Sequence, residues 1–179
     1  MDETVVESAL RIRQMEALGA DEVEALADVL VECVEGGASV GFVLPMTRDK
    51  ARTFWTRVGE TLKRGARQLL VAETAAGQIV GTVQLVEPSS ENQPHRADVA
   101  KMLVRPSARR RGVGALLLAA VERVAREQGK TLLVLDTATA EADRLYARHG
   151  WKLTGEIPEF ALFPDGSPCA TRIYYKKIG

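Results

Sequence analysis

The stretch from Val99 to Ala120 limits the possible folds of this chain more than any other part of its sequence. A short apolar strand pattern leads through a proline-containing loop to Arg109-Arg110-Arg111-Gly112-Val113-Gly114, and an apolar helix pattern follows. The free N–H groups and the positive dipole end of a helix start attract phosphate, and glycine lets a pyrophosphate approach the backbone. Arginine adds charge-assisted hydrogen bonds to phosphate oxygens. The stretch therefore predicts a strand, loop and helix that together bind a phosphate-bearing ligand.

Two other glycine motifs fit this sequence poorly. The dinucleotide-binding pattern needs a third glycine three residues after Gly114, and that position is Leu117. The triphosphate-binding pattern ends like Gly129-Lys130-Thr131, but Val124 stands where its first glycine belongs. An isolated basic triplet is also compatible with a solvated turn or a nonspecific polyanion patch. The strand before it and the apolar helix after it favour a specific phosphate site.

Composition limits the class of protein. With 179 residues and 46% hydrophobic content, the chain can bury one core, so we expect a single domain over 1–179. Its 24 basic and 24 acidic residues balance, which disfavours a nucleic-acid partner. The polar, acidic start and the lack of a run of about 18 apolar residues predict a cytoplasmic protein without a membrane partner. Isolated cysteines and histidines predict reduced thiols and no metal site: Cys33, Cys169, His95 and His149.

Strand and helix patterns follow one another without repeats or a clear linker. Apolar spacing and turn residues predict, in order, a strand, two helices, three strands, a helix, a strand, a helix and two strands. Asp21 is expected to cap the first helix and Thr47 to begin the second. The strands are predicted at 9–13, 68–73, 78–86, 96–104, 131–135, 151–155 and 170–176, and the helices at 22–34, 48–64, 113–128 and 140–148.

Both this order and the glycine loop resemble a known family. Read as Arg-x-x-Gly-x-Gly from Arg109 to Gly114, the loop is similar to the acetyl-coenzyme A loop of the GCN5-related N-acetyltransferases, the GNAT superfamily. The resemblance implies an α+β (α/β) fold with a mixed central sheet of about six to seven strands, helices on both faces and a splayed fourth strand. Further segments look like the tabtoxin-resistance acetyltransferase branch of that superfamily: 37–42, 92–98, 101–109, 135–137, 164–166 and 171–176.

The resemblance implies acetyl-CoA as co-substrate and no metal. It assigns acetyl-CoA binding to the backbone of the fourth strand and to the loop and helix start that follow. Tyr146 stands where the resemblance places the phenol that donates a proton to the departing thiolate. A half-buried structural tyrosine on an amphipathic helix is the alternative. The implied acetyl-CoA contacts are Met102, Leu103, Val104, Arg109, Arg110, Arg111, Gly112, Val113, Gly114 and Ala115.

The general base is left open between two aspartates. Strand alternation predicts that Asp98 lies on the same face as Ala100 and Met102, toward the acceptor. Asp136 ends a buried strand and resembles the carboxylate of the related branch, although it could equally cap the next helix. Asp98 replaces a glutamate that is usual in that branch, and the loop between Asp136 and Tyr146 is one residue shorter. Weaker candidates, each expected to be a solvated strand end, are Glu73 and Glu87.

Four residues are candidates for contact with the acceptor. Ser39, Phe42 and Trp55 come from the region between the first two helices, which borders the acceptor site in the family. Phe42 and Trp55 are also typical core residues. Gln84 could face the pocket from the neighbouring strand, although an exposed polar position is its alternative. Packing explains His149 and Trp151, so neither is given a catalytic role.

The function implied is an acetyl-CoA-dependent N-acetyltransferase. Its acceptor would be the primary amine of a small-molecule or amino-acid-like substrate, and the related branch suggests detoxification of a toxin or antibiotic. The alternatives are a protein N-terminal or lysine acetyltransferase and a non-catalytic acyl-CoA-binding module. Retention of Tyr146 and of the two aspartates speaks against the module. The oligomeric state is expected to be a monomer or a homodimer.

Overall fold

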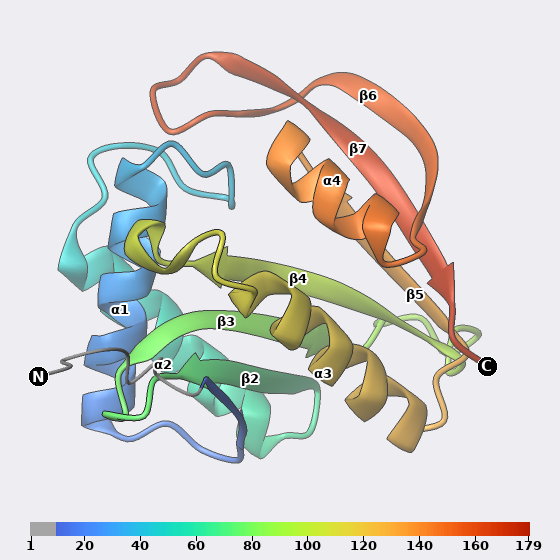
Figure 1. The fold of residues 1–179 in the computed structure, drawn as a ribbon, viewed down its shortest axis with the longest axis horizontal. Helices are drawn as coiled ribbons and strands as arrows, with labels where there is room; N and C mark the ends of the chain where they lie inside the picture. Colours follow the sequence, from blue (N-terminus) through green and yellow to red (C-terminus); the bar gives the residue numbers. More distant parts are fainter. Residues whose placement is uncertain (1–9) are drawn as a thin grey trace, which may run out of the picture.

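The computed structural model describes residues 10–179, and its elements follow the predicted order (Figure 1). The first predicted strand includes residue 9, which lies outside the described residues. The strands are β1 (Arg11–Met15), β2 (Arg67–Glu73), β3 (Ile79–Val86), β4 (Arg96–Val104), β5 (Leu132–Thr137), β6 (Lys152–Leu162) and β7 (Pro168–Lys177). The helices are α1 (Ala20–Glu35), α2 (Arg48–Lys63), α3 (Val113–Glu127) and α4 (Ala140–Arg148), with a short 3₁₀ turn η1 (Pro106–Ala108).

The described strands form one mixed sheet in the order β1-β2-β3-β4-β5-β7-β6. Only β4 and β5 pair in parallel, and the other neighbours are antiparallel. Along β2, Leu70 and Ala72 pack with α3, whereas Leu69 and Val71 pack with α1 and α2. This alternation places helices on both faces of the sheet, so the predicted mixed sheet with helices on both faces is confirmed.

The splay predicted for the fourth strand is present. β4 and β5 pair only where Arg96–Asp98 lies beside Leu132–Val134. Beyond that point the strands separate, and the second half of β4 has no partner on its β5 side. Backbone N–H and C=O groups along this open edge are therefore free to bind an extended ligand.

A β-bulge at Lys101 changes which side chains of β4 share a face. Gln84 pairs with Ala100 and Thr82 pairs with Leu103, so β4 holds one residue more than β3 across this interval. Lys101 has a left-handed φ of 50°. An extra residue reverses the alternation downstream of the bulge. The prediction that Asp98 and Met102 share a face is therefore wrong, because Met102 packs into the α3 core with Ala97 and Val99.

Two further boundaries differ from the prediction. The cap of α1 is Gly19, whose N–H donates to the Glu22 carboxylate, so Asp21 lies in the first turn and does not cap the helix. Thr47 does cap α2, accepting from the Lys50 N–H. β6 extends to Leu162, well past the predicted end, because an edge strand exposed on both faces shows no apolar alternation.

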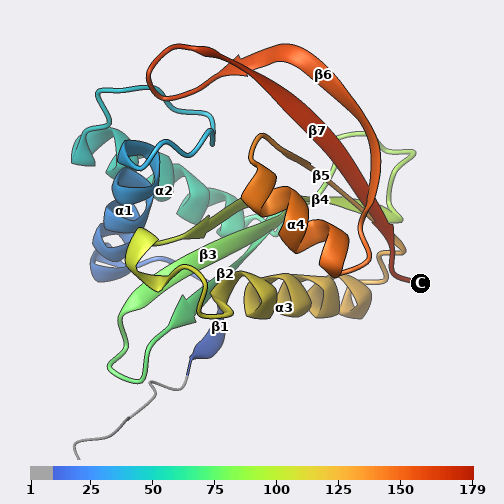
Figure 2. The same ribbon diagram turned by 45° about the horizontal axis from the view of Figure 1, so that its top comes forward.

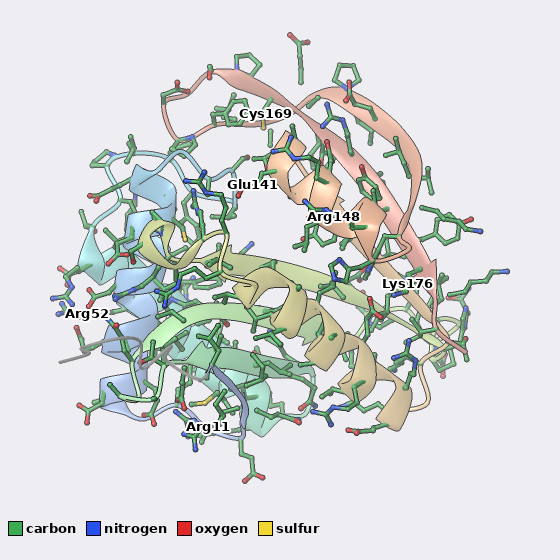
Figure 3. The ribbon with its side chains drawn as sticks, in the orientation of Figure 1. Arg11, Arg52, Glu141, Arg148, Cys169 and Lys176 are labelled. Atoms are coloured by element: carbon green, nitrogen blue, oxygen red, sulfur yellow. The ribbon has the colours of Figure 1, made fainter. Side chains whose placement is uncertain are left out.

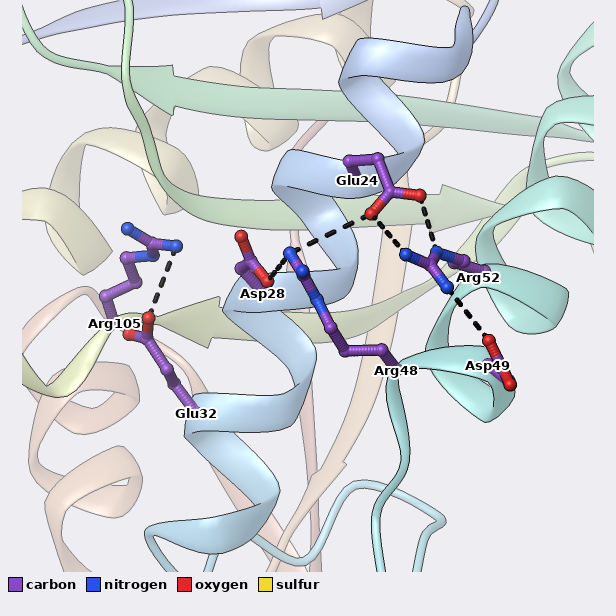
Figure 4. Close-up of polar contacts among 7 residues, drawn as sticks. All are labelled: Glu24, Asp28, Glu32, Arg48, Asp49, Arg52 and Arg105. Atoms are coloured by element: carbon purple, nitrogen blue, oxygen red, sulfur yellow. Dashed lines mark hydrogen bonds and ion pairs between the residues drawn. The ribbon is translucent and has the colours of Figure 1, made fainter.

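Ion pairs connect α1 to its neighbours (Figure 4). Arg52 Nε lies 2.5 Å from the Glu24 carboxylate, and Arg105, just after β4, lies 3.3 Å from the Glu32 carboxylate. These side chains are largely solvated on at least one side, so each pair contributes little to stability and mainly fixes orientation.

Within residues 10–179, no helix is long and apolar enough to cross a membrane.

Glu73 and Glu87 are not the solvated strand ends that the sequence predicted. Glu73 is 2% exposed and accepts hydrogen bonds from Arg11 and Arg13, each at 2.8 Å from a carboxylate oxygen. Glu87 is half-buried and pairs with Lys130 at 2.5 Å. These partners come from distant parts of the chain, so local sequence did not reveal them.

The Glu73 pair makes the stability of this sheet edge depend on pH. Burial opposes ionisation, but the Arg13 and Arg11 hydrogen bonds outweigh it and hold the pKa of the Glu73 carboxyl below its ordinary value of 4.5. A lowered pKa stabilises the folded state above pH 4.5, and that stabilisation is lost as pH falls through the folded value. We expect Glu73→Gln to lower the melting temperature at pH 7, and we expect its difference from the wild type to shrink as the pH falls from 7 to well below 4.5. A constant difference across that range, measured by circular dichroism, would contradict this account.

Candidate active site

A cavity of about 890 Å³ opens where β4 and β5 separate. Five parts of the chain line it: the loop after α1, the second half of β4, the start of α3, the β5–α4 segment, and the hairpin of β6 and β7. In Figure 3, Cys169 of β7 and Glu141 of α4 mark two of these parts. The cavity therefore joins the predicted phosphate loop to Asp136 and Tyr146, two of the three predicted catalytic residues.

The loop after α1 and the β6–β7 hairpin meet above the cavity. Ser39 Oγ donates to the Leu162 carbonyl at 3.3 Å and also lies 3.3 Å from Cys169 Sγ. The Leu44 N–H donates to the Pro164 carbonyl at 2.9 Å. Figure 2 shows the hairpin arching over α4 toward this loop. The two segments thus cover one side of the cavity.

The predicted phosphate loop lies at one end of the cavity. Gly112 caps α3 with a φ of 81°, a left-handed conformation that glycine adopts without strain. The first backbone hydrogen bond of the helix runs from the Leu116 N–H to the Gly112 carbonyl. The N–H groups of residues 113–115 therefore have no acceptor within the helix. These residues line the cavity, so their N–H groups are available to an anion.

The three loop arginines differ in their surroundings. Arg109 Nε donates to the Val104 carbonyl at 3.2 Å, so Arg109 partly serves to hold the loop against β4. Arg110 is exposed and lines the cavity. Arg111 is exposed and lies outside the cavity lining. The loop therefore combines one structural guanidinium, that of Arg109, with one exposed guanidinium at the cavity, that of Arg110.

Gly114 has a packing role that the sequence did not reveal. A Cβ at this position would lie 3.2 Å from Leu145 Cδ2. The small residue thus lets α3 approach α4, as well as leaving the backbone open to a ligand.

The predicted contacts on β4 differ in exposure. Leu103 is 2% exposed, so it can offer a ligand little beyond its backbone groups, whereas Met102 and Val104 are half-buried at the open edge of the strand.

Tyr146 lies on α4 and reaches the cavity from a buried position. It is 4% exposed and packs against Trp151 and Tyr174 at ring-centroid distances of 5.8 and 5.9 Å. Burial, together with the Asp136 and Asp143 carboxylates, raises the pKa of the Tyr146 phenol. The phenol is therefore protonated at neutral pH and able to donate.

The structure separates the two candidate bases. Asp136 lines the cavity just past the last β4–β5 pair and accepts a hydrogen bond from Thr171 Oγ1 at 3.1 Å. Asp98 belongs to that last pair, lies outside the lining and forms an ion pair with Arg96 at 2.6 Å. The helix-cap alternative for Asp136 is wrong, because Thr139 caps α4 by accepting from the Ala142 N–H.

Of the four predicted acceptor contacts, only Ser39 lines the cavity. Phe42 packs edge-on against Phe54 at 5.3 Å, and the fully buried Trp55 follows in the same aromatic row. Gln84 is fully buried on β3 and accepts from Arg67, so an exposed position is wrong for it. Phe42 and Trp55 therefore belong to the core that packs α1 and α2 against the sheet.

Sequence reasoning missed Lys101. Lys101 lines the cavity, and its Nζ lies 6.0 Å above the Phe54 ring. Burial lowers the pKa of the Lys101 ammonium, with Asp136 acting in the opposite direction and Arg67 adding to the decrease. The signal was available for Lys101: simple alternation puts this lysine on the same side as Val99 and Leu103, where a charge is unexpected. Among residues 10–179, no group of three or more metal-ligating side chains is present.

Comparisons with known proteins identify the family. The domain family described as acetyltransferase (GNAT) domain matches residues 65–153. An uncharacterized N-acetyltransferase in the hisH–hisA intergenic region of Azospirillum brasilense is 31% identical over 127 residues, 70% of this chain and 73% of that protein. The chain therefore belongs to the GNAT acetyltransferase family. Its activity class is N-acetyltransferase, and the tabtoxin-resistance branch stays a prediction.

Solved structures show the same fold. YncA from Salmonella typhimurium, determined with its cofactor acetyl-CoA, has a TM-score of 0.77 at 18% identity, covering 96% of this chain and 95% of YncA. A ribosomal-protein-alanine N-acetyltransferase from Brucella melitensis has a TM-score of 0.77 at 22% identity, covering 93% of this chain and 99% of that one. Such identities establish the fold and do not identify an acceptor.

Proposed function

We propose that this protein transfers an acetyl group from acetyl-CoA to the primary amine of a small-molecule or amino-acid-like acceptor. One observation carries the proposal: a single cavity joins the open α3 start, the free edge of β4, and the Asp136–Tyr146 pair. The N–H groups of 113–115 with Arg110 suit a pyrophosphate, and the backbone of 102–104 suits the extended pantetheine arm. Both reactants would then be held together in a ternary complex.

The catalytic roles follow from the two polar side chains at the splay. When bound, acetyl-CoA supplies a thioester carbonyl carbon that the amine nitrogen attacks. The Asp136 carboxylate accepts the proton that the ammonium must lose before attack. The protonated Tyr146 phenol donates its proton to sulfur as the C–S bond breaks, and the nitrogen that now bears the acetyl group returns its second proton to the phenolate. Positioning and these proton transfers are the protein's share of the chemistry.

The covered side of the cavity favours a small acceptor over a peptide. Contacts between the loop after α1 and the β6–β7 hairpin, such as Leu44 to Pro164, close the path that an extended chain would need. A protein N-terminal or lysine acetyltransferase would need those contacts to open. Detoxification of an amine-bearing toxin or antibiotic is compatible with a small acceptor, and the resemblance to the tabtoxin-resistance branch supports it.

A screen of amines tests this function. The protein is incubated with acetyl-CoA and a panel of amino acids, amino-acid amides, polyamines, aminoglycosides and short peptides, and free thiol is detected. We expect acceptor-dependent thiol release with small amines, and mass spectrometry should find the acetylated product. Release with peptides alone would favour the protein acetyltransferase, and acetyl-CoA binding without any transfer would favour the non-catalytic module.

A further inference from the structure

A network of polar side chains fixes α4, the helix that carries Tyr146, to the last strand of the sheet. Tyr174 of β7 donates from its hydroxyl to one Asp143 carboxylate oxygen at 3.0 Å. Arg172, also on β7, donates from Nη1 to the other Asp143 oxygen and from Nε to Glu156 of β6 at 2.7 Å. The network lies outside the cavity lining, so it acts on the helix and not on a ligand.

The position of α4 depends on its contacts with the rest of the fold. The helix has 9 residues, and isolated helices shorter than about 12–15 residues are marginal in water. Its apolar side chains Ala142, Leu145 and Tyr146 pack into the α3 core. Apolar packing is non-directional, whereas hydrogen bonds to a carboxylate fix an orientation. The Asp143 contacts are therefore suited to set how α4 is rotated and shifted on β7.

Asp143 and Tyr146 are tied to each other through Tyr174. They are three residues apart on α4, so their side chains are neighbours on the helix surface. The Tyr174 ring packs against the Tyr146 ring at a centroid distance of 5.9 Å, while its hydroxyl donates to Asp143. After burial and Asp136, the Asp143 carboxylate also contributes to the raised pKa of the Tyr146 phenol. A shift of Asp143 would therefore change the surroundings of the phenol.

Strand β7 connects this network to the candidate base. Side chains alternate along a strand, so Arg172 and Tyr174 lie on one face of β7 and Thr171 on the other. Thr171 Oγ1 donates to the Asp136 carboxylate at 3.1 Å. The same stretch of β7 thus contacts the proposed base directly and holds the helix of the proposed acid through Asp143. It is placed to fix the two proton-transfer groups relative to each other.

We propose that Asp143, held by Tyr174 and Arg172, is a positioning residue that directs the Tyr146 phenol at the sulfur of acetyl-CoA. This inference rests on the proposed function and adds a residue to it. Proton transfer needs hydrogen-bond distance between the phenol and the departing thiolate, and a displacement of about 1 Å can cost roughly a hundredfold in rate. Loss of Asp143 should therefore lower turnover and leave the affinity for both substrates unchanged.

A double-mutant cycle tests whether Asp143 acts through Tyr146. Wild type, Asp143→Ala, Tyr146→Phe and the double variant are assayed with acetyl-CoA and the best acceptor of the amine panel. The control Glu127→Ala removes an exposed, arginine-paired carboxylate from α3 and should keep the wild-type kcat. We expect Asp143→Ala to lower kcat by roughly five- to fiftyfold at unchanged KM, but by less than about twofold in the Tyr146→Phe background. Losses that multiply in the double variant, or a wild-type kcat in Asp143→Ala, would overturn the proposal.

Fluorine NMR tests the same contacts without turnover and with a milder variant. The chain has 3 tyrosines, so labelling with 3-fluorotyrosine gives one resonance each for Tyr146, Tyr174 and Tyr175. Tyr174→Phe keeps the ring beside Tyr146 but removes the donor to Asp143, and Tyr175→Phe is the matched control at the next position of β7. We expect Tyr174→Phe to shift or broaden the Tyr146 resonance and Tyr175→Phe to leave it in place.

The two experiments distinguish the inference from the function beneath it. An unchanged Tyr146 resonance in Tyr174→Phe, or an equal change in both variants, would overturn the positioning role and leave the acetyltransferase intact. If the wild type acetylated no amine of the panel, the proposed function would fail. The NMR measurement would still decide whether the Asp143 network fixes Tyr146.

Discussion

Asp136→Asn is expected to lower kcat/KM by about a hundred- to ten-thousandfold, because the asparagine cannot accept the proton of the incoming ammonium. The amide keeps the shape of the side chain and can still accept the Thr171 hydrogen bond. Acetyl-CoA affinity should therefore change little, and so should the melting temperature. Steady-state kinetics and calorimetry on the same preparation provide both measurements.

Asp98→Asn is the matched control. Asp98 lies on the neighbouring strand, pairs with Arg96 and stands outside the cavity lining. We expect its substitution to cost less than about tenfold in kcat/KM, as for residues that do not take part in proton transfer. If Asp98→Asn showed the large loss and Asp136→Asn the small one, the assignment of the base would have to be reversed.

The second large effect concerns the general acid. Tyr146→Phe keeps the ring that packs on Trp151 and Tyr174 but removes the phenolic proton. We expect turnover to fall by roughly ten- to a thousandfold with acetyl-CoA affinity unchanged. Tyr175→Phe, a half-buried tyrosine of β7, serves as control and should keep its activity.

A structural tyrosine would behave differently. In that case Tyr146→Phe would leave turnover nearly intact, because the ring and its packing on Trp151 and Tyr174 are kept. The turnover of this variant therefore distinguishes the two roles. A fully active Tyr146→Phe enzyme would move the acid to another residue.

Features with a local physical origin could be predicted from the sequence. The Gly112–Gly114 loop, the cap at Thr47 and the order of strands and helices follow from neighbouring residues, and the structure contains them. The separation of β4 from β5 was predicted only from the resemblance to the GNAT family, because no local pattern in either strand indicates it. The sequence and the resemblance therefore predict where the site lies, but they do not predict how its side chains are arranged.

Features that depend on long-range pairing could not be predicted. The bulge at Lys101 arises from the register between β3 and β4, and it reversed the faces on which Asp98 and Met102 had been placed. Arg67 and Gln84 meet only because β2 pairs with β3, so neither residue alone indicates their hydrogen bond. Asp136 could be preferred over Asp98 as the candidate general base only once the end of the β4–β5 pairing was known.

Calorimetric titration of acetyl-CoA tests the central claim most directly. We expect the wild type to bind one equivalent, and Arg110→Gln/Arg111→Gln to bind roughly ten- to a hundredfold more weakly, because the charge of Arg110 at the cavity and the neighbouring charge of Arg111 are both lost. Both side chains are exposed, so the fold should persist, and the control Arg123→Gln removes an exposed arginine farther along α3. Wild-type affinity in the control and weakened affinity in the loop variant would support a phosphate site at the start of α3. No binding by the wild type, or equal affinity in all three proteins, would contradict it.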